Sequence, residues 1–239
     1  MKRLLIIAII STITLSVSAQ DYLGFHIGYA QPITRLNAPE TKTTLTPTSY
    51  NGFKVGLVYE AVVYKGFGVS LGLNYTFGAN ATDWMKKVTN QPAEYPKVRS
   101  KGQYHQLEIP VDWQYKFEIA KETWVIVYTG PTLQCGLSME EKWYINTGKE
   151  NGITMTQTEN LYSVEEMKDY ALKRINVTWG FGAGFQYGRY FLRGGYDLGL
   201  INPYKSYQFD VLVGEGHPRT RGRFDQWQIK VGMYLWQSK

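Results

Sequence analysis

Charged side chains fall at alternate positions within several segments of this 239-residue chain. Four acids and four bases share this placement: Lys54, Glu60, Glu108, Asp112, Lys116, Arg193, Asp197 and Lys230. Opposite charges that meet in a protein interior form ion pairs, because an unpaired buried charge is costly. The equal numbers favour a structural network of ion pairs. A narrow ion or proton path, or an occluded binding site, remains the alternative.

A hydrolytic triad is the second chemistry that the residue types permit. His26, Ser70 and Asp197 lie on polar positions of three segments, and a serine nucleophile would need all three to converge. No nucleophile motif surrounds Ser70, and such residues in strands are usually hydrogen-bonded filler. The three histidines lack metal-ligand spacing, and a single cysteine excludes an intrachain disulfide. We therefore expect no catalytic residue, no metal and no cofactor.

Longer polar stretches between the alternating segments carry candidate contact residues. These are Trp84, Trp143, His217, Arg219, Arg221 and Arg223, which we expect in loops. Guanidinium groups match phosphate oxygens, so the basic residues suit lipopolysaccharide or an acidic protein partner. A solvated rim is the plainer alternative. Ser163 to Glu166 forms a capping box that predicts a short helix to about Arg174.

Eight segments with a period of two must position these side chains. They are residues 23–29, 53–60, 67–77, 105–117, 124–137, 175–187, 190–201 and 227–235. In most of them large apolar residues fill one face, and glycine or polar residues fill the other. This period is typical of β-strands. Pro110 and Pro131 lack a backbone donor, so they predict a bulge or kink where the fourth and fifth strands meet.

The two faces of these strands favour a membrane over water. The apolar faces are rich in aromatic residues and almost free of charge, whereas the polar faces are rich in glycine. Short links (64–66, 118–122 and 188–189) alternate with long ones (31–51, 78–103, 138–174 and 202–223). A soluble barrel or sandwich also alternates, but lacks this asymmetry. The prediction is an all-β, eight-stranded antiparallel transmembrane up-and-down β-barrel with short periplasmic turns and long external loops.

The first residues predict export from the cytoplasm. Lys2 and Arg3 precede an apolar run from Leu4 to Ile10, and small residues precede a cleavage site after Ala19. We expect a signal peptide at residues 1–19 and an outer-membrane domain at residues 20–239. Cleavage takes Lys+Arg from 26 to 24 against 20 acidic residues, a mature net charge of +4. The basic residues form no long run, which argues against nucleic acid as a partner.

Several short motifs resemble a known group of proteins. They are Leu107–Pro110 (LEIP) followed by Tyr115–Phe117, Thr129–Pro131, Gly180–Phe185 and Tyr196–Asn202. Together they resemble the PorT-like or porin-family small outer-membrane barrels of Bacteroidota, over nearly the whole mature chain. The resemblance implies assembly in the outer membrane and carries over no catalytic residues. One departure is that Trp236 is followed by three more residues, where such barrels usually end on an aromatic residue.

The function expected from these patterns is structural. We expect a membrane-embedded structural or interaction barrel in the cell outer membrane, tied to secretion or to the cell surface, and not an enzyme. Its expected partners are outer-membrane lipid or lipopolysaccharide and a protein at the external loops. The alternatives are a narrow channel and a lipid-modifying enzyme of the outer membrane.

Overall fold

The computed structural model describes residues 20–37, 48–81, 97–146, 155–160, 162, 172–203 and 221–238. The strands are β1 (Gln20–Asn37), β2 (Thr48–Ser49), β3 (Asn51–Tyr64), β4 (Phe67–Ala81), β5 (Lys97–Ala120), β6 (Thr123–Asn146), β7 (Met155–Asn160), β8 (Ile175–Tyr187), β9 (Tyr190–Gly199) and β10 (Arg221–Gln237). Within these ranges no helix has the length and apolar character needed to span a membrane.

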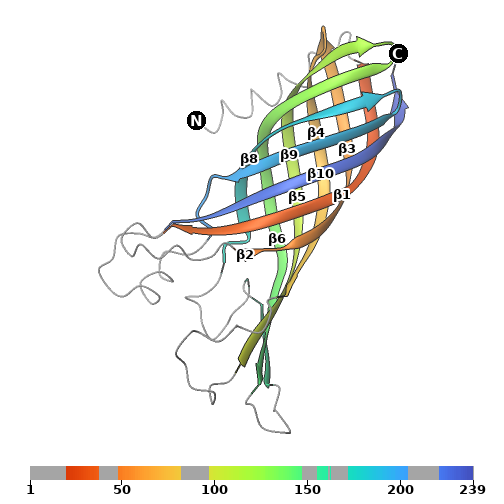
Figure 1. Cartoon of the computed structure of the whole chain (residues 1–239). Helices are drawn as coiled ribbons and strands as arrows, with labels where there is room; N and C mark the ends of the chain where they lie inside the picture. Colours follow the sequence, from red (N-terminus) through yellow and green to blue (C-terminus); the bar gives the residue numbers. More distant parts are fainter. Residues whose placement is uncertain are drawn as a thin grey trace.

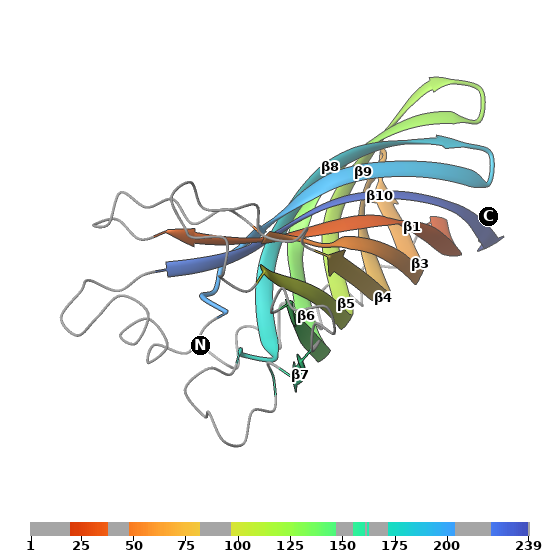
Figure 2. The ribbon, with the colours of Figure 1, turned by 60° about the horizontal axis from the view of Figure 1, so that its bottom comes forward.

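Eight long antiparallel strands form a closed ring, which confirms the predicted fold class (Figure 1). Their order is β1-β3-β4-β5-β6-β8-β9-β10, and β10 closes the ring by pairing with β1 along almost its whole length. The two closing strands lie side by side in Figure 2. The short strands β2 and β7 pair with β1 and β6. Seven of the predicted alternating segments lie within one of the eight long strands, and the eighth, 190–201, runs two residues past the end of β9.

Several strands extend well beyond their predicted ends. β5 and β6 are 24 residues each, and their pairing extends, with interruptions, from Lys97–Asn146 to Ala120–Thr123. Backbone groups of antiparallel neighbours satisfy each other whatever the side chains are, so pairing continues where the apolar alternation stops. Trp143, Arg221 and Arg223 were therefore wrongly predicted to lie in loops: the first is in β6, the others in β10.

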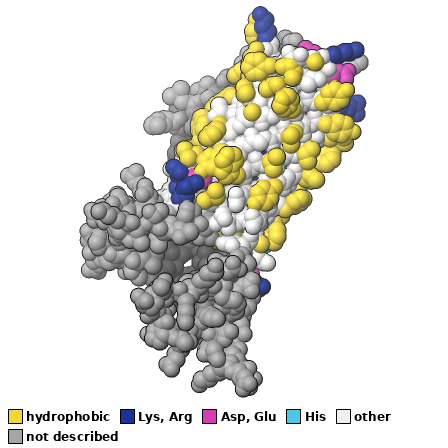
Figure 3. Space-filling view, viewed as in Figure 1, with side chains coloured by type: hydrophobic (Ala, Val, Ile, Leu, Met, Phe, Trp, Pro, Cys, Tyr) yellow, Lys and Arg dark blue, Asp and Glu magenta, His cyan; other side chains and the backbone are white. Residues whose placement is uncertain are grey.

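The wall of the barrel is apolar outside and polar inside. In β3 the side chain of Leu57 is 55% exposed, whereas those of Lys54 and Glu60 are completely buried. The same alternation recurs around the ring, and Figure 3 shows apolar side chains spread over the wall between its two ends. Such a surface exposes far more apolar area than water tolerates on a soluble monomer. It is the arrangement expected of a barrel surrounded by lipid.

Three two-residue turns lie at one end of the ring: Lys65–Gly66, Lys121–Glu122 and Gly188–Arg189. Lys65 and Gly66 both have positive φ, 44° and 90°, the pattern of the tight hairpin turn that matches the twist of the strands. The link predicted at 188–189 is confirmed, and the other two are shorter than predicted. The carboxyl terminus lies at this end too, which we call the short-turn end (Figure 1).

Two turn glycines provide a test of the backbone geometry. A methyl group on Gly66 would lie 2.2 Å from the carbonyl oxygen of Lys116, whereas one on Gly188 would meet nothing within 4 Å. Gly188→Ala then carries only the cost of its positive φ, about 1–2 kcal/mol. We expect Gly66→Ala to cost about 2–4 kcal/mol, because a steric clash is added. Urea unfolding of the two variants checks this, and equal losses would contradict the turn geometry.

The strand ladder is interrupted at the two prolines. The pairing of β5 with β6 stops at Pro110–Thr132 and resumes at Trp113–Thr129, which leaves two residues unpaired on each strand. The predicted irregularity is therefore present, but as an unpaired stretch that keeps its register and not as a bulge. Gly72 of β4 faces this stretch, and a Cβ there would lie 2.7 Å from Cγ of Pro110. The proline ring thus takes the space that this glycine leaves.

Candidate functional site

The polar faces of the strands converge in the lumen. All eight charged residues predicted to form the network lie there, each at most 6% exposed. They are contributed by β3, β5, β9 and β10, so the ring brings together groups that are far apart in sequence. Most of them fall into two hydrogen-bonded groups, one around Glu60 and one around Glu108.

The first group surrounds Glu60 near the short-turn end. Its carboxylate is in contact with Lys116 Nζ at 2.7 Å and with the guanidinium group of Arg193. The hydroxyl of Tyr234 donates to it at 2.6 Å, and the side-chain amide of Gln114 donates at 3.0 Å. Two cations and two neutral donors therefore share one buried carboxylate. They come from three strands, so this group ties β3, β5, β9 and β10 together across the lumen.

The second group surrounds Glu108 farther along the lumen. Lys54 Nζ lies 2.6 Å from its carboxylate and also donates to Gln228 Oε1 at 2.9 Å. Thr76 Oγ1 donates to the same carboxylate at 2.7 Å, and the amide of Gln226 donates at 3.2 Å. This group joins β3, β4, β5 and β10. The neutral residues that complete both groups were not among the predicted site residues.

Asp197 finds amide partners where a cation was expected. Gln228 Nε2 donates to both of its carboxylate oxygens, at 2.9 and 3.0 Å. Within the described ranges Asp197 forms no ion pair, because the nearby Lys54 contacts Glu108. The structure also does not bring Asp197 to the cavity that holds His26 and Ser70. The three residues considered for a hydrolytic triad therefore do not come together.

Asp112 and Lys230 face a small cavity in the lumen. His26, Ser70 and Asn74 also line it, and His26 Nε2 lies 3.0 Å from Asn74 Oδ1. Both charged side chains are buried, yet neither is in an ion pair with any described residue. Opposite charges that share a buried cavity stabilise each other through a low-dielectric space.

A double-mutant cycle at this cavity measures that stabilisation. We expect Asp112→Asn and Lys230→Met each to lower the free energy of unfolding, because each removes the charge that faces the other across the cavity. Arg193 also lines this cavity, but its guanidinium group is in an ion pair with Glu60. The double variant should be more stable than the sum of the two losses predicts, with a coupling of about 0.5–3 kcal/mol. Urea unfolding in lipid vesicles gives the four stabilities. Strictly additive losses would show that the two charges do not interact.

A third polar group lies on the outer wall and was missed from the sequence. Asp225 of β10 forms ion pairs with Arg35 of β1 and Arg223 of β10, at 2.9 and 2.8 Å. The hydroxyl of Tyr196 donates to it at 2.8 Å, and the backbone N–H of Gly199 donates at 3.0 Å. An acid two positions before Trp227, on an otherwise apolar face, was the available signal. It was overlooked because the predicted strand began only at residue 227.

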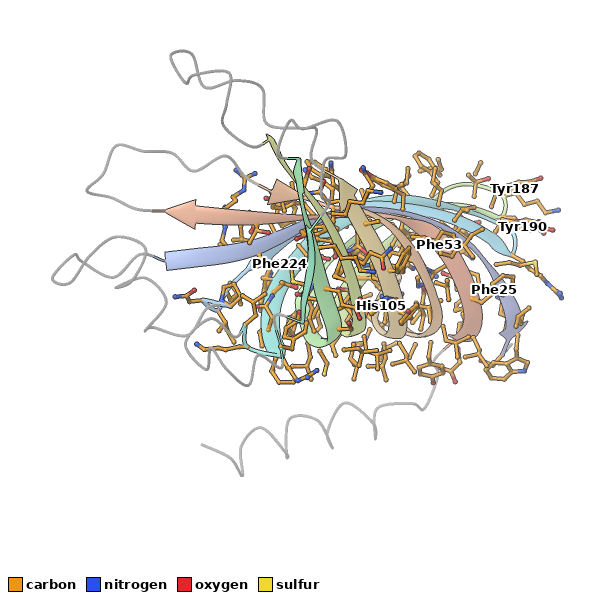
Figure 4. The ribbon with its side chains drawn as sticks, turned by 90° about the horizontal axis from the view of Figure 1, so that it is seen from below. Phe25, Phe53, His105, Tyr187, Tyr190 and Phe224 are labelled. Atoms are coloured by element: carbon orange, nitrogen blue, oxygen red, sulfur yellow. The ribbon has the colours of Figure 1, made fainter. Side chains whose placement is uncertain are left out.

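Other predicted features lie partly or wholly outside the described residues. These are the signal peptide at residues 1–19, the contact candidates Trp84, His217 and Arg219, and most of the helix predicted after Ser163. The described end of that helix, residues 172–174, is not helical. Tyr187 and Tyr190 pair across the β8–β9 turn and lie together at the short-turn end (Figure 4). In the described ranges no three His, Cys, Asp or Glu side chains are placed to hold a metal ion.

Residues 15–204 match the family model described as an outer membrane protein beta-barrel domain. The chain belongs to this family. It is a membrane-embedded barrel protein of the outer membrane. In barrels of this class the short turns face the periplasm and the long loops face the outside. The Glu60 group therefore lies toward the periplasm, and the Asp225 group lies toward the cell surface.

Solved structures of other small barrels resemble this chain in fold. Ail, the attachment invasion locus protein of Yersinia pestis, in complex with the heparin analogue sucrose octasulfate, is 11% identical with a TM-score of 0.41. It covers 91% of this chain and 99% of its own. Neisserial surface protein A is 13% identical with a TM-score of 0.36, over 88% of this chain and 97% of its own. None of the curated proteins matches the sequence.

Proposed function

We propose that this protein is a structural or interaction barrel that catalyses no reaction. The strands anchor it in the outer membrane, and the long-loop end meets outer-membrane lipid, lipopolysaccharide or a protein partner. The single observation that supports this proposal best is the filled lumen. Glu60 and Glu108 are each held by several donors from other strands of the ring, so the interior serves to hold the ring together.

The same filled lumen argues against the channel alternative. Eight strands enclose a space just wide enough for side chains to fill. An ion crossing it would have to separate Lys54 from Glu108 and Glu60 from both of its cations. We expect the purified protein to produce no sizeable single-channel current in planar lipid bilayers. Steady currents would instead favour the narrow channel.

A PorT-like character and a tie to secretion or to the cell surface belong to this proposal. They rest on the short motifs, above all Leu107–Pro110 and Tyr196–Asn202. We expect the contacts outside the membrane to be made by the long segments between strands, among them residues 82–96 and 204–220. Each of these segments carries two basic residues, two acidic residues and at least two aromatic residues, a composition that suits mixed polar and aromatic contacts with a protein partner.

Pull-down of the tagged full chain from solubilised outer membranes tests the interaction. We expect a protein partner that the intact chain retains and that is lost when residues 82–96 and 204–220 are replaced by Gly-Ser linkers. A control chain with a replaced short turn, Lys121–Glu122 exchanged for Asn-Gly, should retain it. Retention by both altered chains would contradict the proposed role of the external segments.

Mass spectrometry of lipid A tests the absence of catalysis. Deletion cells and wild-type cells should yield the same lipid A species, because the lumen groups are engaged with one another. A mass difference that the intact gene restores would instead favour the lipid-modifying enzyme.

A further inference from the structure

The Asp225 group is unusual because a charged residue occupies the lipid-facing side of a strand. Two and four residues farther along β10, Trp227 and Ile229 are 54% and 50% exposed. Asp225 shares their face, yet its side chain is 0% exposed. It is covered because the side chains of Arg35 and Arg223 lie against it from β1 and from its own strand. Each of these arginine side chains is 45% exposed.

The carboxylate of Asp225 uses all of its hydrogen-bond acceptor capacity, whereas the two guanidinium groups use only part of their donor capacity. It accepts hydrogen bonds from Nε of Arg35 and of Arg223, from the Tyr196 hydroxyl and from the Gly199 backbone. A carboxylate offers about four acceptor sites, while each guanidinium carries five N–H donors. Asp225 therefore holds two arginines side by side through their Nε atoms. Tyr196 accepts a further hydrogen bond from Arg35, and the carboxylate cannot take up the donors that remain on the two guanidinium groups. One carboxylate between two cations also leaves a net charge of +1.

The position of this group along the barrel places it at a membrane boundary. The rings of Tyr196 and Trp227 pack edge to face with 5.0 Å between centroids, and Phe181 packs on Tyr196. Aromatic rings of this kind collect where hydrocarbon meets the polar headgroups. The arginines lie beyond them, toward the long-loop end. Figure 3 shows basic side chains together with an acidic one at the border of the apolar wall on that side.

We propose that Arg35 and Arg223 form a binding site for a phosphate group of an outer-leaflet lipid, namely lipopolysaccharide. The N–H groups that Asp225 and Tyr196 do not use donate hydrogen bonds to the phosphate oxygens. A planar guanidinium group makes this contact better than a lysine ammonium group does. Asp225 is the positioning residue, because it holds both forks on the outer wall at the depth of the headgroups. This inference rests on the proposed contact with outer-leaflet lipid and names the residues that make it.

The binding experiment compares the wild-type chain with Arg35→Gln/Arg223→Gln, both in zwitterionic detergent micelles. The probes are lipopolysaccharide and the same preparation after enzymatic dephosphorylation, with affinity measured by microscale thermophoresis. We expect the wild-type chain to bind the phosphorylated form about tenfold more tightly, which corresponds to about 1.4 kcal/mol. The variant should bind both forms with the same, weaker affinity. A variant that retains the tenfold preference would overturn the proposal.

Two further chains keep the result interpretable. Lys121→Gln/Arg189→Gln removes the same charge from exposed residues at the short-turn end and should retain the full preference. Arg35→Gln/Asp225→Asn/Arg223→Gln also removes the carboxylate that the double variant leaves unpaired. This triple variant should fold even where the double variant does not, and it should show no preference for phosphorylated lipopolysaccharide. Heat-modifiable gel mobility verifies the folded barrel in each case.

Competition with inorganic phosphate distinguishes a lipid site from a site for the free ion. We expect millimolar phosphate to displace little lipopolysaccharide, because the acyl chains add affinity on the adjoining apolar wall. Displacement at equimolar phosphate would overturn the assignment to lipid. The pull-down tests the protein partner separately, so a negative pull-down would not contradict the proposed phosphate site. Unchanged lipopolysaccharide affinity in the folded arginine variants would overturn it and leave the anchor role standing.

Discussion

Glu60→Gln is expected to lower the free energy of unfolding by about 3–5 kcal/mol, the usual cost of removing one partner from a buried ion pair. The substitution keeps the shape of the side chain but removes the charge that Lys116 and Arg193 share. Two buried cations are then left close together with only neutral acceptors. Urea unfolding in lipid vesicles, followed by tryptophan fluorescence, measures the loss.

Two comparisons separate loss of the charge from general damage. Glu118→Gln, at an exposed position of β5, should cost no more than about 0.5 kcal/mol. Glu60→Met/Lys116→Met/Arg193→Met removes all three charges and should recover much of the stability, because no uncompensated charge is left. If Glu60→Gln cost less than about 1 kcal/mol, the carboxylate would not be the centre that holds the lumen together.

Leu57→Arg tests the outer, apolar wall of the barrel. Leu57 lies midway along β3, between the outward-facing Phe25 of β1 and Leu73 of β4, and all three are well exposed. An arginine at the bilayer midplane costs about 2–4 kcal/mol. We expect this loss in vesicle unfolding measurements, with a lower yield of the heat-modifiable folded form.

The matched control lies on the same strand. Tyr64→Arg places the same charge beside the Lys65–Gly66 turn, where the wall meets water, and should cost only about 0–1 kcal/mol. The difference between the two positions reports the depth of the surrounding hydrocarbon. Equal costs would mean that the apolar wall does not face lipid, and the inside-out arrangement of the barrel would then be wrong.

The period of two in the sequence was enough to predict the number of strands and the two faces of most of them; the segment 124–137, which is apolar on both faces, was the exception. Side chains of a strand alternate between faces whatever their neighbours are, so Leu57 and Lys54 could be assigned to wall and lumen without coordinates. The glycine of the 188–189 link likewise predicted a tight turn, because its positive φ is a local requirement. Closure of the ring was predicted from more than the alternation: the charged, glycine-rich polar faces and the alternating short and long links favoured a membrane barrel, which leaves no edge strand unpaired.

The partners inside the lumen were beyond the reach of the sequence. Glu60 meets Arg193 and Tyr234 across 133 and 174 positions of chain, and these contacts depend on the stagger of the strands around the ring. That stagger also gave Asp197 an amide in place of a cation and left Asp112 and Lys230 facing a cavity. Charge balance predicted that pairs would form but not which ones.

The sequence by itself determined the strands, their inward and outward faces and the membrane as their surroundings, because each of these follows from the local order of side chains. Only the tertiary structure decided how far the strands run past the apolar belt, which lumen charges meet, and that Asp225 gathers two arginines on the outer wall. Those outcomes depend on the register between strands that are distant in the chain. Backbone hydrogen bonds fix that register, and the alternation of side chains along one strand does not encode it.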